Sequence, residues 1–149
     1  MKKKLLALVL AAAMTLSLAS CGGSKTETPS TGSDNPSAEG ATYTVGICQL
    51  VQHPALDAAT QGFIDALNEA LPGQVTFENK NASGEANNCG TIVNGFVSEG
   101  VDLIMANATA ALTAAASATA DIPILGTSIT EYGVALGISD FTGVVGTNV

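Results

Sequence analysis

The stretch from Tyr43 to Leu71, YTVGICQLV-QH-PALDAATQGFIDALNEAL, indicates the class of fold, because a strand pattern leads directly into a helix pattern. Residues 43–51 alternate and cluster apolar side chains as a strand does. Pro54 suits the first turn of a helix, where its missing N–H costs nothing. One buried helical stripe follows at spacings of three and four, formed by Leu56, Ala59, Phe63, Leu67 and either Ala70 or Leu71. The stretch therefore predicts a strand–helix unit.

The same alternation continues after Pro72-Gly73, which ends the first helix. Residues 74–80 alternate apolar and polar side chains and predict a second strand. A second helix follows, with Ser83 as its expected N-cap and Gly100 as its left-handed stop. Its buried stripe comprises Cys89, Ile92, Val93, Phe96 and Val97.

Three further segments extend the pattern. The apolar run at 101–106 predicts a strand covered on both faces, residues 110–120 predict an alanine-rich helix, and residues 122–126 predict a fourth strand. We also expect short strands at 134–138 and 144–149. The order β-α-β-α-β-α-β with short connections predicts an α/β fold: a Rossmann-like parallel sheet with helices on both faces.

The first 21 residues have the features of an export signal. Lys2 to Lys4 precede an apolar run, residues 5–18, which is too short for a permanent membrane anchor. The following Leu-Ala-Ser-Cys-Gly-Gly resembles the lipobox of bacterial lipoproteins, which implies cleavage before Cys21 and a lipid on that cysteine. We expect residues 1–20 to be a signal peptide, and the mature protein to be extracytoplasmic and lipid-anchored to the bacterial cell membrane.

Residues 21–42 are expected to form a disordered tether behind the lipidated cysteine, because Ser, Thr, Gly and Pro dominate there. Residues 43–149 suffice for one hydrophobic core. The whole chain carries 5 Lys+Arg against 13 Asp+Glu, and all five are lysines. Affinity for nucleic acids comes from basic side chains on phosphates, so this composition argues against a nucleic-acid partner.

Candidate ligand-binding residues follow from the rule that ligands of open parallel sheets sit beyond the carboxyl ends of the strands. The rule selects residues 49–53, 107–109 and 127–130. The candidates in these segments are Gln49, His53, Asn107, Thr109, Ser128 and Thr130. The first two segments lead into helix N-termini, whose N–H groups suit a ligand carboxylate. Each candidate also has a purely structural interpretation as a helix cap, a turn residue or a hydrogen-bond partner within the fold.

Motifs for catalysis or metal binding are missing from the sequence. It has one histidine and no C-x-x-C, and it lacks the glycine patterns of phosphate loops. Thr130 stands where a nucleophile elbow needs its second glycine. We therefore expect no catalytic residue, no metal and no cofactor. Cys48 and Cys89 are interpreted as two buried free thiols, with a disulfide as the alternative that an exported domain permits.

A resemblance to a known family rests on the segment V-G-I-C-Q-L-V-Q-H-P-A-L-D at 45–57. This segment resembles the opening of ABC-transporter substrate-binding lipoproteins, a family that includes the tryptophan-binding TrpX-like proteins. The likeness continues through D-L-I-M-A-N-A-T at 102–109, D-I-P-I at 121–124 and F-T-G-V-V-G-T-N at 141–148. It implies a type I periplasmic binding protein, in which two α/β lobes close on one ligand. Residues 43–149 would be the N-terminal lobe, and we expect the chain to be truncated after it.

The resemblance implies a solute-binding lipoprotein, and no enzyme, that hands a small ligand to an ABC permease. An aromatic or other amino acid is the expected ligand class. The chain departs from the family at Ala110, where proline is frequent, and at Glu131-Tyr132-Gly133. A sugar or nucleoside is the alternative ligand, and Tyr132 is the residue expected to stack on it. A sensory lipoprotein and an exported α/β enzyme are the alternative functions.

Overall fold

The computed structural model describes residue 40 and residues 42–149. The predicted signal peptide and the lipidation site at Cys21 lie outside these residues, as does nearly all of the predicted tether. The elements described are β1 (Tyr43–Gln49), α1 (Pro54–Ala70), β2 (Val75–Asn81), α2 (Ala86–Glu99), β3 (Leu103–Asn107), α3 (Thr109–Ala118), β4 (Ile124–Thr127) and α4 (Tyr132–Leu136). Within this part of the chain, no helix is long and apolar enough to cross a membrane.

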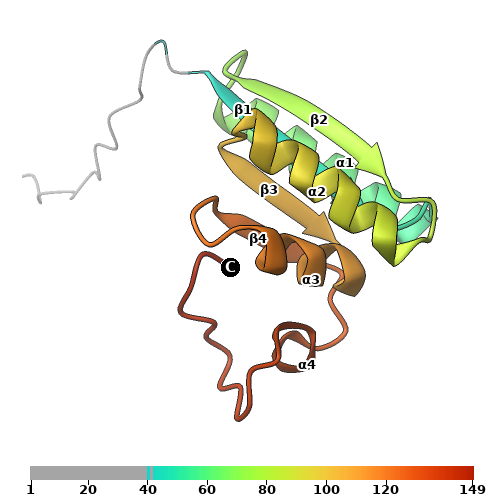
Figure 1. The fold of residues 1–149 in the computed structure, drawn as a ribbon. Helices are drawn as coiled ribbons and strands as arrows, with labels where there is room; N and C mark the ends of the chain where they lie inside the picture. Colours follow the sequence, from blue (N-terminus) through green and yellow to red (C-terminus); the bar gives the residue numbers. More distant parts are fainter. Residues whose placement is uncertain (1–39, 41) are drawn as a thin grey trace, which may run out of the picture. The chain divides into compact units, whose positions relative to one another are not determined.

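The four strands form one parallel sheet in the order β2–β1–β3–β4 (Figure 1). β1 is a central strand, and its last residue, Gln49, pairs with Asn81 of β2 and with Asn107 of β3. The carboxyl ends of three strands are therefore in register. Side chains from distant parts of the sequence meet at this edge of the sheet.

Helices cover both faces of the sheet: α1 packs on one face, and α2 and α3 pack on the other (Figure 1). The core on the α1 face contains Val45, Ile47 and Met105, with Phe63, Ile64 and Leu67 packed against them. The core on the other face contains Cys48, Cys89, Val93, Phe96, Ile104, Ala106, Leu112 and Ala115, among others. The predicted α/β fold, a parallel sheet with helices on both faces, is confirmed.

Close packing of α2 on β1 depends on Gly46. A Cβ at this position would stand 2.6 Å from ring carbons of Phe96, so a side chain fits there only if α2 moves. The Phe96 side chain is 1% exposed. Phe96, one residue of the helical stripe predicted from the sequence, therefore packs against the one residue of β1 that has no side chain.

The start of α2 differs from the prediction. Its N-cap is Glu85, whose side chain makes no capping hydrogen bond, and Ser83 adopts a left-handed conformation with φ of 56°. The Ser83 N–H donates to the Oδ1 of Asn81 at 2.8 Å, so a side-chain turn at the end of β2 holds Ser83 before the helix begins. Gly100 ends α2 in the left-handed conformation, as predicted.

The predicted strands at 134–138 and 144–149 are wrong. Residues 132–136 form α4, because the Glu131 carboxylate accepts the N–H groups of Gly133 and Val134 and caps a helical turn. The final residues adopt no regular structure. The side chain of Asn148 donates to the carbonyls of Thr119 and Ile122 at 3.1 and 2.7 Å. These contacts hold the chain beside the start of β4 without a strand ladder.

Cys48 and Cys89 are both buried and free, as predicted. Burial and the neighbouring Cys89 raise the pKa of Cys48 to about 12. Burial also raises the pKa of Cys89. Because only the thiolate is a strong nucleophile, both side chains act as small apolar residues at neutral pH.

Candidate ligand-binding site

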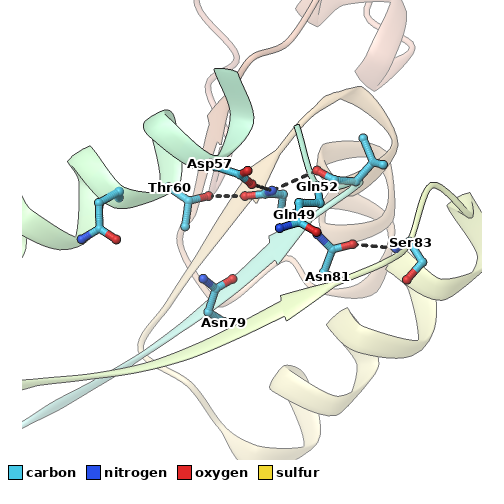
Figure 2. A pocket seen from close by; sticks show the side chains of 9 residues that line it. Gln49, Gln52, Asp57, Thr60, Asn79, Asn81 and Ser83 are labelled. Atoms are coloured by element: carbon cyan, nitrogen blue, oxygen red, sulfur yellow. Dashed lines mark hydrogen bonds between the residues drawn. The ribbon is translucent and has the colours of Figure 1, made fainter. Parts of the chain in front are cut away.

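A polar hollow of about 700 Å³ opens at the carboxyl ends of β1 and β2, beside α1 (Figure 2). Its lining consists of Gln49, Val51, Gln52, Asp57, Thr60, Gln61, Asn79, Asn81 and Ser83. Amide and hydroxyl groups dominate this set. Asp57 carries the one charge among these nine described residues. The volume lies within the range of small-molecule sites.

Strand alternation places these side chains on one face. In β1, Val45, Ile47 and Gln49 point toward α1, and the residues paired with them in β2 point the same way. The first of these β2 residues, Phe77, packs with the apolar core on the α1 face. The last, Asn81, is exposed and lines the hollow. The hollow thus begins where the apolar face of β2 becomes polar.

A chain of hydrogen bonds runs beside the hollow from β3 to α1. The Nδ2 of Asn107 donates to the Oγ1 of Thr60 at 2.9 Å, and the Thr60 hydroxyl donates to the Oε1 of Gln49 at 2.7 Å. The Nε2 of Gln49 then donates to the Oδ1 of Asp57 at 2.6 Å. Asn107, Thr60 and Gln49 are at most 4% exposed. Each residue of this series donates to the next one, and the Asp57 carboxylate is the last acceptor of the series.

Most polar groups of Gln49 and Asn107 are already used within the fold. The Nε2 of Gln49 also donates to the carbonyl of Val51 at 2.9 Å, so both of its N–H groups have acceptors. The Nδ2 of Asn107 also donates to the carbonyl of Leu56 at 2.8 Å. The Oδ1 of Asn107 is buried and has no partner in the described part of the chain. Both side chains tie strand ends to the first turns of α1.

His53 lies at the N-terminus of α1, and its side chain is exposed. Its Nδ1 accepts the N–H of Ala55 at 3.2 Å, which makes His53 the N-cap of the helix. The structural interpretation of His53 as a helix cap is therefore confirmed. Its contact with a ligand stays a prediction.

The other three predicted residues lie around α3 and the end of β4. The Oγ1 of Thr109 accepts the N–H of Thr130 at 3.4 Å. Ser128 is exposed and has a left-handed φ of 57°. None of the three lines the hollow. The six candidates thus form two groups on the same sheet edge, and of the six only Gln49 lines the hollow itself.

Val51 and Gln52 belong to the predicted segment 49–53, but six other residues that line the hollow were not predicted to bind a ligand: Asp57, Thr60, Gln61, Asn79, Asn81 and Ser83. Asp57 and Thr60 lie three positions apart on one face of α1, a spacing that could have drawn attention to them. Asn79 and Asn81 continue the alternation of an otherwise apolar strand face. Polar residues at positions where the alternation calls for apolar ones could have indicated a binding site.

Tyr132, which the sugar hypothesis needed for stacking, has partners within the fold. Its hydroxyl donates to the carbonyl of Gly126 at 2.8 Å, and its ring stacks on Phe141 with centroids 6.3 Å apart. These contacts give the ring a structural role. Among the described residues, no group of three His, Cys, Asp or Glu side chains could hold a metal ion.

Comparison with known proteins gives consistent results. The sequence model of a family described as ABC transporter substrate binding protein matches residues 44–149. A curated relative, the tyrosine-binding protein of Clostridioides difficile strain R20291, is 34% identical over 133 residues. The alignment covers 87% of this chain and 38% of the relative. The chain thus spans well under half the length of this relative.

Solved structures of similar proteins support the fold. A substrate-binding protein with adhesive properties from Clostridium difficile, in a ligand-free, open state, matches with a TM-score of 0.65 and 37% identity, over 72% of this chain and 37% of that one. A conserved domain protein from Vibrio cholerae matches with a TM-score of 0.65 and 34% identity, and the match covers 72% of this chain and 37% of that one. An ABC domain from Streptococcus pneumonia, in complex with L-Trp, matches with a TM-score of 0.61 and 33% identity. The match covers 64% of this chain and 33% of that one.

Proposed function

The chain belongs to the family of ABC transporter substrate-binding proteins, and from this premise we propose that it captures a small solute outside the cytoplasm for an ABC importer. The observation that carries the proposal is the polar hollow at the carboxyl edge of β1 and β2. Open parallel sheets bind ligands at this edge, and the hollow has the volume of a small-molecule site. The proposed role is binding and delivery, without catalysis.

We propose an amino acid as the ligand, and an aromatic one first. One relative is named a tyrosine-binding protein, and one similar structure holds L-Trp. The lining of the hollow is compatible with this class, because amides, hydroxyls and a carboxylate can bind the polar end of an amino acid.

We further propose that residues 43–149 act as the N-terminal lobe of a two-lobed protein that closes on its ligand by a hinge motion. In that arrangement the two groups of predicted residues lie beside the same cleft, at the carboxyl ends of the strands. Thr109, Ser128 and Thr130 would bind the ligand with hydroxyl groups, and the first turn of α3 would offer N–H groups to its carboxylate. Gln49, His53 and Asn107 lie on the side of β1 and β3.

The N-terminal segment supports a membrane-anchored delivery protein. We propose that residues 1–20 are removed, that Cys21 carries the lipid, and that the following residues tether the domain to the membrane near its permease. Substitution Cys21→Ala tests the anchor. The variant should be released into the medium or periplasm, and metabolic labelling with a fatty acid should be lost. Labelling that persists in the variant would contradict the assignment.

Titration calorimetry on the purified full-length mature protein tests the ligand class. We expect saturable heats with L-tyrosine or L-tryptophan, and none with a panel of sugars and nucleosides. Binding of a sugar or nucleoside without any amino acid would replace this proposal by the alternative. Growth of a deletion strain on a limiting amount of the amino acid separates import from sensing. Loss of an importer should lower uptake of the amino acid and slow growth, whereas loss of a sensor leaves the transporter in place.

A further inference from the structure

We infer that Asp57 binds the ammonium group of the ligand, and that Asn107, Thr60 and Gln49 position its carboxylate for this contact. The inference rests on the proposed function and deepens it, because it says which end of an amino acid this hollow recognises. Asp57 is the acidic residue in the first turn of α1, where a carboxylate stabilises the helix dipole whether or not a ligand binds.

The charge of the hollow favours a cation. Asp57 is the one charged residue among the nine that line it. Lys80 of β2 points to the opposite face from its neighbours Asn79 and Asn81, and its Nζ lies 3.9 Å from Glu78. A ligand anion placed beside Asp57 would therefore meet repulsion with no compensating cation from the lining. An ammonium group would meet attraction.

Asp57 has an oxygen available for a ligand. Its Oδ1 accepts from Gln49, whereas no hydrogen bond from the described residues reaches its Oδ2. Figure 2 shows the carboxylate beside Gln49, at the part of α1 that borders the hollow. Gln52 and Asn79 add amide oxygens to the same lining, and neither makes a side-chain hydrogen bond within the described chain. An ammonium has three N–H donors, which these acceptors can share.

The hydrogen-bond chain gives Asp57 a defined orientation that its role at the helix start does not require. Asn107 donates to both Leu56 and Thr60, so the end of β3 fixes two successive turns of α1. Thr60 then fixes the amide of Gln49, and the remaining Gln49 N–H holds one oxygen of Asp57. A helix dipole is stabilised by a carboxylate in almost any rotamer. A ligand contact needs one rotamer, and buried positioning residues provide it.

The experiment compares an amino acid with the same molecule lacking its amine. L-Tyrosine and 3-(4-hydroxyphenyl)propionate, or L-tryptophan and indole-3-propionate, are titrated into full-length mature protein. We expect wild type to prefer the amino acid by about 30-fold, the lower end for an ion pair enclosed in a site. Asp57→Asn should remove most of this preference by weakening the amino acid alone. Glu69→Gln, which removes another carboxylate of α1 far from the lining, should leave both affinities unchanged.

Thr60 provides the test of positioning. Thr60→Val keeps the shape of the side chain but breaks the hydrogen-bond chain, whereas Thr60→Ser keeps the hydroxyl. We expect Thr60→Val to lower the preference for the amine about tenfold and Thr60→Ser to retain it. A purely structural role would lower the thermal midpoint of Thr60→Val and weaken both ligands of a pair equally.

The inference is overturned if the desamino acid binds wild type as tightly as the amino acid. Equal weakening of both ligands in Asp57→Asn also overturns it, and in both cases the proposed amino-acid binding stands. If no amino acid binds at all, the proposed function fails together with the inference.

Discussion

On the α2 and α3 face of the sheet, Cys48 and Ala106 end their strands among apolar side chains, whereas on the α1 face Gln49 and Asn107 end the same strands in a polar network. The side chains that differ so strongly are sequence neighbours, because successive residues of a strand point to opposite faces. The two faces have similar burial at this edge but different chemistry.

This difference indicates a division of labour between the faces. Apolar burial contributes about 25 cal/mol per Å², whereas a buried hydrogen bond contributes roughly 1 kcal/mol net. The α1 face also contains the unpartnered Oδ1 of Asn107, which costs about 1–3 kcal/mol. Because the larger cluster of buried apolar residues lies on the α2 and α3 face, we expect that face to contribute more to stability than the carboxyl end of the α1 face, where the polar network orients side chains.

The largest effect is expected from Phe96→Ala on the apolar face. The ring is buried against Gly46, so its removal leaves a cavity and should lower the free energy of unfolding by about 3–5 kcal/mol. Equilibrium unfolding in urea measures the loss. Phe77→Ala, at a half-buried position of the α1 face, is the matched control and should cost clearly less. Equal losses would contradict the proposed division.

Asn107→Ala removes the buried first donor of the hydrogen-bond network on the α1 face. The change leaves the Leu56 carbonyl and the Thr60 hydroxyl without their donor, but it also removes the buried unpartnered Oδ1, so unfolding should become easier by about 1 kcal/mol. The affinity for the ligand amine should also fall, because Thr60 loses its anchor. Asn79→Ala, whose exposed side chain makes no hydrogen bond in the described chain, should leave stability unchanged. A fully stable Asn107→Ala variant would show that the network is dispensable.

A rise in pH tests the apolar face through Cys48. Its pKa is raised from 9.0 to about 12 by burial, so the unfolded chain ionises first and the native state holds the proton longer. Stability is therefore complete below pH 9 and falls as the pH rises from 9 toward 12, by up to about 1.4 kcal/mol per pH unit. Urea unfolding between pH 8 and 10 measures the slope. The slope should be shallower in Cys48→Ala, and identical slopes would argue against a buried thiol.

The smallest effect is expected where an apolar side chain lies on neither face. Val134 is 82% exposed on α4, so Val134→Ser should change the free energy of unfolding by less than about 0.5 kcal/mol. Thermal unfolding compares it with wild type. A loss above 1 kcal/mol would mean that Val134 is covered in solution, and would place a further contact surface at α4.

Elements with a strong local signal were predicted correctly. The stripe of α2 follows helical spacing, and the left-handed Gly100 ends the helix as expected. The strand expected at 134–138 failed because the run V-A-L-G-I suits a strand and a helix equally well. The Glu131 side chain decided for the helix by capping two N–H groups. Asp57 was overlooked as a site residue because its place in a first helical turn explained it locally.

The sequence by itself determined the alternation of strands and helices, the apolar stripes that cover both faces, and the family motif, because each depends on residues a few positions apart. Only the tertiary structure decided which polar side chains meet. Gln49 and Thr60 are 11 positions apart, and Thr60 and Asn107 are 47 positions apart. They come together because parallel pairing places β1 beside β3 in register, and because the first turns of α1 lie at the carboxyl ends of both strands. Spacing along the chain does not encode that order of strands.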